Sequence, residues 1–190
     1  MFTYSELKKG LKIILDNQPY EIIEFSPMFK GRGGSVAQTK LKNLIINNII
    51  AKTFRPSDSF EEAEIQKIEI KFLYFHRDKF VFCEKNNPNK RIELTKEQIN
   101  RTAQFLKQNE IVEGIVFNEK IINISLPIKI QLKVTEAPPG IQGNRSEAGT
   151  KTVILETGAK INTPLFIKEG DIIEVNTENG EYVKRLNTIS

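Results

Sequence analysis

Alternating apolar and polar residues run through most of the chain and predict many short β-strands. Ile68, Ile70, Phe72 and Tyr74, for example, are expected to share a face, while Lys67, Glu69 and Lys71 lie opposite. The predicted strands cover residues 12–15, 20–25, 38–44, 49–54, 67–74, 79–84, 128–134, 172–175 and 181–184. Turn signals separate them, among them residues 16–19, residues 76–78 and Asn179-Gly180. Strands at this spacing are typical of small barrels or sandwiches, so the pattern predicts an all-β fold.

Only one segment has a helical pattern. Thr95 and Gln98 form a capping box, and Ile99, Ala103 and Leu106 recur at helical spacing after it. Breaks near residues 57–64 and 126–127 then divide the chain into three expected units, residues 1–64, 65–127 and 128–190. Each unit is small, so we expect the units to lean on one another for stability.

Composition narrows the possible classes of protein. The chain has 190 residues, of which 39% are hydrophobic and 27% charged, as in globular proteins. No apolar run is long enough to cross a bilayer, and the N-terminus lacks a signal-peptide pattern, so we expect a cytoplasmic protein. A single cysteine, Cys83, and a single histidine, His76, exclude a disulfide framework and an ordinary zinc site, and we expect no cofactor.

The net charge of +4 is modest, but its distribution is uneven. No acidic residue occurs from Phe25 to Ser57, so we expect a cationic surface with nothing local to neutralise its basic residues. These are Lys30, Arg32, Lys40, Lys42, Lys52 and Arg55. The segment predicts either a phosphate-binding surface or an ordinary solvated face, and charge alone does not decide between them.

Residues 28–35 predict a glycine-rich hairpin loop with Arg32 at its tip. Gly31, Gly33 and Gly34 surround this arginine, and glycine tolerates the positive φ angles of tight turns. A long cationic side chain on a thin loop can enter a crevice, although a basic residue in a turn more commonly serves solubility. The loop does not match the phosphate-binding G-x-x-x-x-G-K-[ST] motif, so nucleotide binding is not indicated.

Three segments carry a resemblance to a known family. The longest runs from Thr157 to Thr177 and ends with Gly180-Glu181-Tyr182, and residues 10–14 and 39–44 add to it. Over essentially its whole length the chain resembles bacterial elongation factor P. The segment 40–44 favours the main branch of this family over an elongation-factor-P-like paralogue.

The resemblance implies an SH3-like, KOW-type barrel followed by two OB-fold barrels. It also implies a monomeric, non-enzymatic elongation factor that binds the ribosome between the P and E sites and relieves stalling at polyproline stretches by stimulating peptide-bond formation. Its partners would be the rRNA of both subunits and the peptidyl-tRNA, with no membrane involved. The family's key residue lies eight positions before the first lysine of the K-L-K motif, Lys40, which gives Arg32.

Some members carry a rhamnosylated arginine at this tip, so the resemblance implies an arginine-modifying enzyme of the rhamnosyltransferase type as a further partner. Lys30 stands where many lysine-type members have proline, and Gly143-Asn144-Arg145 replaces a Gly-Asp-Thr loop near the exit-site codon. The expected tip loop is therefore Lys30, Gly31, Arg32, Gly33 and Gly34. The expected RNA-binding residues are Lys40, Lys42, Lys52, Arg55 and Arg145.

Two other classes of function fit parts of the sequence. A free-standing RNA or single-stranded nucleic-acid binding protein built from OB-fold barrels fits the strands and the charge, and affinity for ribosomal complexes over naked RNA would separate it from the factor. An enzyme is third. His76 is expected at a strand end, Cys83 as a packed side chain, and Glu61, Glu62 and Glu64 in a solvated linker.

Overall fold

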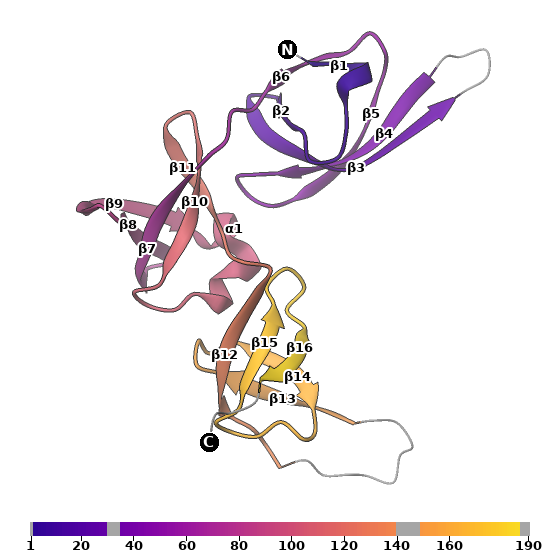
Figure 1. Ribbon diagram of the computed structural model, residues 1–190. Coiled ribbons are helices and arrows are strands. Elements are labelled where there is room, and N and C mark those ends of the chain that lie inside the picture. The colour runs from indigo at the N-terminus through magenta and orange to yellow at the C-terminus, as the bar shows by residue number, and fades with distance from the viewer. Residues whose placement is uncertain (1, 30–34, 140–148, 187–190) are drawn as a thin grey trace. The chain divides into compact units, whose positions relative to one another are not determined.

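The alternating side chains build three antiparallel sheets in the computed structural model, which describes residues 2–29, 35–139 and 149–186 (Figure 1). The first sheet has the order β1-β6-β2-β3-β4-β5. Its strands are β1 (Phe2–Thr3), β2 (Lys12–Leu15), β3 (Gln18–Phe29), β4 (Ser35–Asn43), β5 (Ile49–Phe54) and β6 (Ser59–Glu62). A short 3-10 helix, Tyr4–Glu6, follows β1. The core of this sheet is formed by Ile13, Ile22, Leu41, Phe54 and Phe60 with their neighbours.

The second and third sheets share one strand order. In each of these sheets, the first strand in chain order lies in the middle. The second and third strands lie on one side of it, and the fourth and fifth strands lie on the other side. The second sheet contains β7 (Gln66–His76), β8 (Lys79–Glu84), β9 (Asn87–Thr95), β10 (Ile111–Phe117) and β11 (Lys120–Ser125). The third contains β12 (Lys129–Glu136), β13 (Thr150–Leu155), β14 (Lys160–Pro164), β15 (Ile172–Asn176) and β16 (Tyr182–Leu186). The end strands also approach each other, β9 with β11 and β14 with β16, so each sheet curls toward a barrel.

Two-residue turns with positive φ angles set several strand boundaries. Asp16 and Asn17 have φ of 50° and 59°, and Arg77 and Asp78 have 47° and 61°, as tight hairpins require. The turn expected at residues 76–78 is confirmed at Arg77 and Asp78, while His76 still belongs to β7 (Gln66–His76). The turn expected over residues 16–19 is shorter than predicted, because β3 already begins at Gln18 and Pro19 lies within it. Pro19 pairs with Ile14, and its carbonyl accepts a hydrogen bond from the backbone N–H of Leu44.

The predicted helix begins as expected but is shorter. The Thr95 hydroxyl accepts from the backbone N–H of Gln98, and the Gln98 side chain accepts from that of Thr95, which confirms the capping box. The α-helix α1 (Lys96–Ile99) then ends at Asn100, whose φ of 50° leaves the helical region. A 3-10 helix, Asn100–Phe105, continues the segment. The prediction of one continuous helix through Leu106 is therefore wrong in extent.

Contacts within the chain define two compact units, and each expected segment contains one sheet. The first unit comprises residues 1–100 and 111–125, and the second comprises residues 101–110 and 126–190. In the second unit, Phe105 is 1% exposed and packs into the core of the third sheet. Partial burial acts to raise the pKa of Glu156, but hydrogen bonds from the Lys107 side chain and the Lys133 backbone outweigh it and hold this pKa below its ordinary value. The segment 101–110 thus belongs physically to the third sheet.

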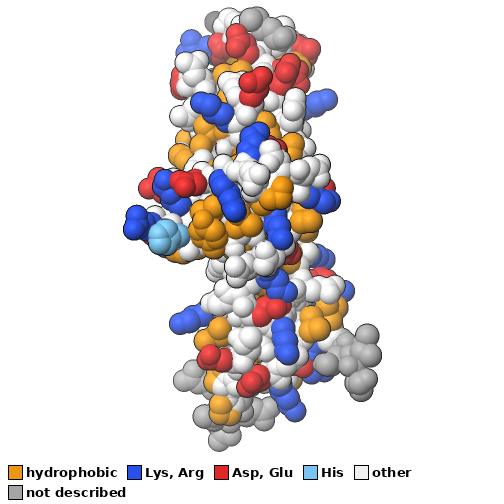
Figure 2. Space-filling view, turned by 90° about the vertical axis from the view of Figure 1, so that its left-hand side faces the viewer, with side chains coloured by type: hydrophobic (Ala, Val, Ile, Leu, Met, Phe, Trp, Pro, Cys, Tyr) orange, Lys and Arg blue, Asp and Glu red, His pale blue; other side chains and the backbone are white. Residues whose placement is uncertain are grey.

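Cationic and anionic side chains are interspersed on the face seen in Figure 2. In the second sheet, neighbouring strands and the turn after β8 supply opposite charges. Lys67 pairs with Glu113 and Lys85 with Glu69, each at 2.6 Å, and Lys79 pairs with Glu93. These exposed pairs contribute little to stability, but they cancel charge locally.

A buried asparagine joins the first two sheets within the first unit. Asn123 on β11 is 1% exposed, and its Nδ2 donates to the carbonyls of Leu44 and Ile45 at 3.2 and 3.1 Å. Its Oδ1 accepts from the backbone N–H of Ile124 at 2.7 Å. Apolar side chains, including Leu44 and Ile122, pack around it. Every hydrogen-bonding group of this side chain is therefore occupied.

Replacing Asn123 tests whether this residue holds the first two sheets together. Asn123→Ala removes the donor for two carbonyls, and we expect it to lower the free energy of unfolding by about 1–3 kcal/mol, the cost of unsatisfied buried polar groups. Gln66→Ala, an exposed position at the start of β7, is the control and should stay within about 0.5 kcal/mol of the parent. Urea unfolding followed by circular dichroism measures both. Equal stability of the two variants would contradict the structural role of Asn123.

Candidate nucleic-acid interface

The longest strand ladder of the first sheet forms an arm that leads to the expected tip loop. β3 and β4 pair from Tyr20 opposite Asn43 to Phe29 opposite Ser35 (Figure 1). β5 pairs with β4 only from Lys42 to Ala37, so the last two pairs of the arm lie beyond the third strand. Met28 and Phe29, at the end of the arm, are 40% and 89% exposed. The predicted tip residues Lys30, Gly31, Arg32, Gly33 and Gly34 lie outside the described residues, as does Arg145.

Alternation on β4 separates a core face from an outer face. Ala37, Leu41 and Asn43 are buried, whereas Gln38 and Lys40 are exposed. Two rows of side chains cross the outer face of the three strands. One row is Glu24, Lys40 and Ala51, and the next is Ser26, Gln38 and Thr53.

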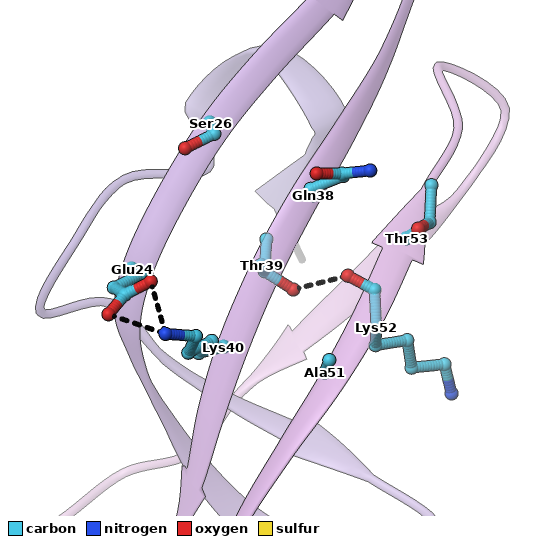
Figure 3. Close-up of a pocket in the computed structure, with 8 residues that line it drawn as sticks. All are labelled: Glu24, Ser26, Gln38, Thr39, Lys40, Ala51, Lys52 and Thr53. Carbon is cyan, nitrogen blue, oxygen red and sulfur yellow. Dashed lines mark hydrogen bonds and ion pairs between the residues drawn. The ribbon is translucent and has the colours of Figure 1, made fainter.

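These two rows border a shallow pocket of about 310 Å³ (Figure 3). Thr39 and Lys52 also border the pocket, although strand alternation turns their side chains to the other face. The Thr39 hydroxyl donates to the carbonyl of Lys52 at 2.8 Å. The hydroxyls of Ser26 and Thr53, the Gln38 amide and the Lys40 ammonium are the kinds of donors that contact phosphate and sugar oxygens. Sequence reasoning missed the polar members of this lining, since only the strand register brings them together.

The charge of this face differs from the sequence prediction. Lys40 forms an ion pair with Glu24, with its Nζ 2.9 Å from the carboxylate, and Figure 3 shows the lysine reaching toward this acid. Glu21 lies opposite Lys42 in the same ladder. The prediction that nothing local neutralises the acid-free segment is therefore wrong, because β3 places acids from just before the segment beside its lysines. Glu24 and Lys40 each stand eight residues from Arg32, a symmetry that could have revealed their pairing.

The predicted lysines also do not share one face. Lys52 pairs with Thr39, and its neighbours in alternation, Ile50 and Phe54, contribute to the core. Its side chain therefore lies on the other face of β5 from Ala51, and Figure 3 shows it extending away from Lys40. Arg55 is exposed in the turn after β5, where its backbone N–H donates to the carboxylate of Asp58 at 2.8 Å. Lys40 and Lys42 thus form one surface, and Lys52 lies apart from it.

The residues considered for catalysis are separated or buried. Cys83 is buried in β8 opposite Lys71, while His76 is exposed at the end of β7 opposite Lys79, as expected from the sequence. Across the described ranges, no group of three or more acidic, histidine or cysteine side chains could hold a metal ion. Within the same ranges, no helix is long and apolar enough to cross a membrane.

Comparison with known proteins identifies the family that has this architecture. Three family models match in chain order: the elongation factor P KOW-like domain over residues 3–60, the elongation factor P OB domain over residues 65–124, and elongation factor P, C-terminal, over residues 130–185. The chain belongs to the elongation factor P family. It is a KOW-like barrel followed by two OB-fold barrels, and its family is one of translation factors.

Curated relatives of this family match nearly the full length. Elongation factor P of Syntrophus aciditrophicus is 40% identical over 98% of this chain and 99% of its own, and that of Natranaerobius thermophilus is 37% identical over 98% of both. A solved structure of eukaryotic translation initiation factor 5A from Methanococcus jannaschii has a TM-score of 0.52, covering 65% of this chain and 90% of its own at 19% identity. That last likeness concerns the fold alone.

The Glu24–Lys40 pair gives a test of the outer face. Glu24→Gln releases Lys40, so we expect tighter binding to a labelled RNA hairpin and a log–log salt slope steeper by up to about 0.9, the release of one further counterion. Fluorescence anisotropy at several salt concentrations measures this. Glu62→Gln, on β6, changes the net charge equally and is the control. If both variants gain affinity to the same extent, only net charge acts and the local pairing has no role.

Proposed function

We propose that this chain binds the ribosome between the P and E sites and stimulates peptide-bond formation, relieving stalling at polyproline stretches. Its three domains follow the boundaries 1–64, 65–127 and 128–190. It contacts the rRNA of both subunits and the peptidyl-tRNA and acts as a monomer. Membership of the elongation factor P family over nearly the full length supports this function.

The observation that carries the proposal is the β3–β4 arm. Its ladder stays paired to Phe29 and Ser35, directly before and after residues 30–34. β3 and β4 extend beyond the end of β5, so the chain that connects them begins at the end of a projecting two-stranded ladder. An arm of this kind supports a tip that enters a site too narrow for a folded barrel.

Arg32 is the functional residue of this tip, and Lys30, Gly31, Gly33 and Gly34 form its loop. A guanidinium is a planar, permanently charged donor, suited to phosphate and sugar oxygens near the acceptor end of a tRNA. The contribution to the reaction is positional: the tip restrains a poorly reactive peptidyl-tRNA and neither forms bonds nor transfers protons. Rhamnose added by an arginine-modifying enzyme lengthens the side chain and supplies hydroxyl groups.

The barrels supply most of the binding free energy through phosphate contacts. Lys40 and Lys42 act from the outer face of β4, and Arg55 acts from the turn after β5. Lys52 approaches RNA from the opposite face of the sheet, and Arg145 acts in the third domain. Because Lys40 already has an acidic partner, its contact with phosphate requires exchange of Glu24 for the phosphate.

The proposal is tested by Arg32→Ala. We expect nearly unchanged stability, within about 0.5 kcal/mol, because loop surface changes rarely cost more. Ribosome binding should fall modestly, while synthesis of a reporter with consecutive prolines should fall sharply. The reporter is translated in a system lacking the endogenous factor, with protein purified from its native host, and ribosome affinity is measured in parallel.

Two further variants sharpen this test. Arg101→Ala removes an exposed arginine outside the proposed contacts and should restore synthesis like the parent. Arg32→Lys keeps the charge but loses the planar fork and the substrate of an arginine-specific enzyme, so it should fail as Arg32→Ala does. Full restoration by Arg32→Ala would refute the tip role.

A further inference from the structure

The second sheet carries an aromatic and cationic surface that the proposed function does not use. It lies on the outer face of β7, β8 and β9, which the strand register defines row by row. Tyr74 pairs with Val81 and Val81 with Glu93, forming one row. The expectation that Tyr74 shares a face with Phe72 is wrong, because a register shift between these two residues turns Tyr74 to the outer face. Lys71, Cys83 and Arg91 form the next row, and Ile111 on β10 lies opposite Lys71. Tyr74, Lys71, Arg91 and Ile111 surround Val81 and Cys83 of β8 on this surface, which we call the β8 face.

The centre of the β8 face is apolar, and long cationic side chains lie around it. Val81 and Cys83 are 6% and 3% exposed although they point outward, so the neighbouring side chains cover them. Tyr74 is 48% exposed and Ile111 46%, so their apolar surfaces remain available. Figure 2 shows this side of the molecule, where the single histidine, His76, projects beside hydrophobic and cationic side chains.

The charges on this face leave an excess of cations. The three acids along it, Glu69, Glu93 and Glu113, are each paired with a lysine. Lys71 and Arg91, in contrast, have no ion-pair partner among the residues that the structure describes. An anionic ligand can therefore bind them without breaking an existing pair.

The position of the face within its barrel also points to nucleic acid. β8 and β9 are the second and third strands of an OB domain, and OB folds bind oligonucleotides on the face of these two strands. Proteins that bind single strands combine cations for the backbone with exposed aromatic rings for the bases. Tyr74 supplies such a ring, with Lys71 and Arg91 in the adjacent row.

We propose that the β8 face is a second RNA-binding surface, which holds a short unpaired RNA segment. One base stacks on Tyr74 against the apolar edge, and flanking phosphates contact Lys71 and Arg91. A regular duplex fits poorly, because its bases are already stacked on each other and cannot reach a side-chain ring. This binding is independent of Arg32 and goes beyond the proposed action at the reacting ends.

The test uses the full chain and an unstructured, labelled RNA of about twelve nucleotides, a length within the range that OB folds bind. We expect Tyr74→Leu to weaken binding about fivefold or more, since it keeps apolar bulk but loses the ring, while Tyr74→Phe stays within about twofold. Lys71→Gln and Arg91→Gln should each reduce the log–log salt slope by about 0.7. The chain has no Trp, so quenching of tyrosine fluorescence gives an independent signal of stacking.

A control separates this surface from general charge. Lys120→Gln removes an exposed cation on β11 and should keep parent affinity within about twofold. Circular dichroism should match the parent in every variant. Unchanged RNA affinity in Tyr74→Leu or an equal loss in Lys120→Gln would each overturn the proposal. Equal binding of a labelled RNA duplex of the same length would overturn it as well. Weaker ribosome binding with unchanged RNA affinity would assign the face to a protein partner and overturn it as well.

Discussion

Strand register determines which side chains each small barrel presents to solvent. In the first sheet, burial of Ile22 and Leu41 fixes how β3 and β4 pair, because a slip of one residue would expose both. A register shift between Ile22 and Glu24 then places Glu24, and not Ile23, opposite Lys40. The ion pair, the pocket beside it and the direction of the arm all follow from this packing.

Strand register also explains why the net charge of a sequence segment differs from the net charge around that segment in the folded protein. Residues 25–57 contain no acid, yet their strands lie beside strands that do. In the second sheet, the lysines on β7 and β8 likewise find acids on β9 and β10. A cation such as Arg91, which has no ion-pair partner within the described part of the chain, is more informative about binding than a run of basic residues.

The sequence predicted the strands whose own residues alternate, and it missed those that depend on neighbours. β9 begins with exposed polar residues and has only two alternating apolar residues, Ile92 and Leu94, so its own pattern is weak and its hydrogen bonds to β8 define it. β10 contains Gly114, a weak strand former, but a Cβ there would lie 3.1 Å from Ile70, so close packing explains the glycine. The Glu24–Lys40 pair could have been predicted from its symmetry about Arg32. The opposite orientation of Lys52 required the register of a third strand.

Phe105 makes the third barrel discontinuous in sequence. Residues 101–110 interrupt the strands of the second sheet, yet their largest apolar side chain completes the core of the third. A fragment beginning after residue 127 would therefore carry a hole where this ring belongs. Exchange of the last barrel between relatives, whether in evolution or in the laboratory, has to carry this short segment with it. A cut at residue 127 therefore does not separate the two OB-fold barrels cleanly, despite their shared strand order.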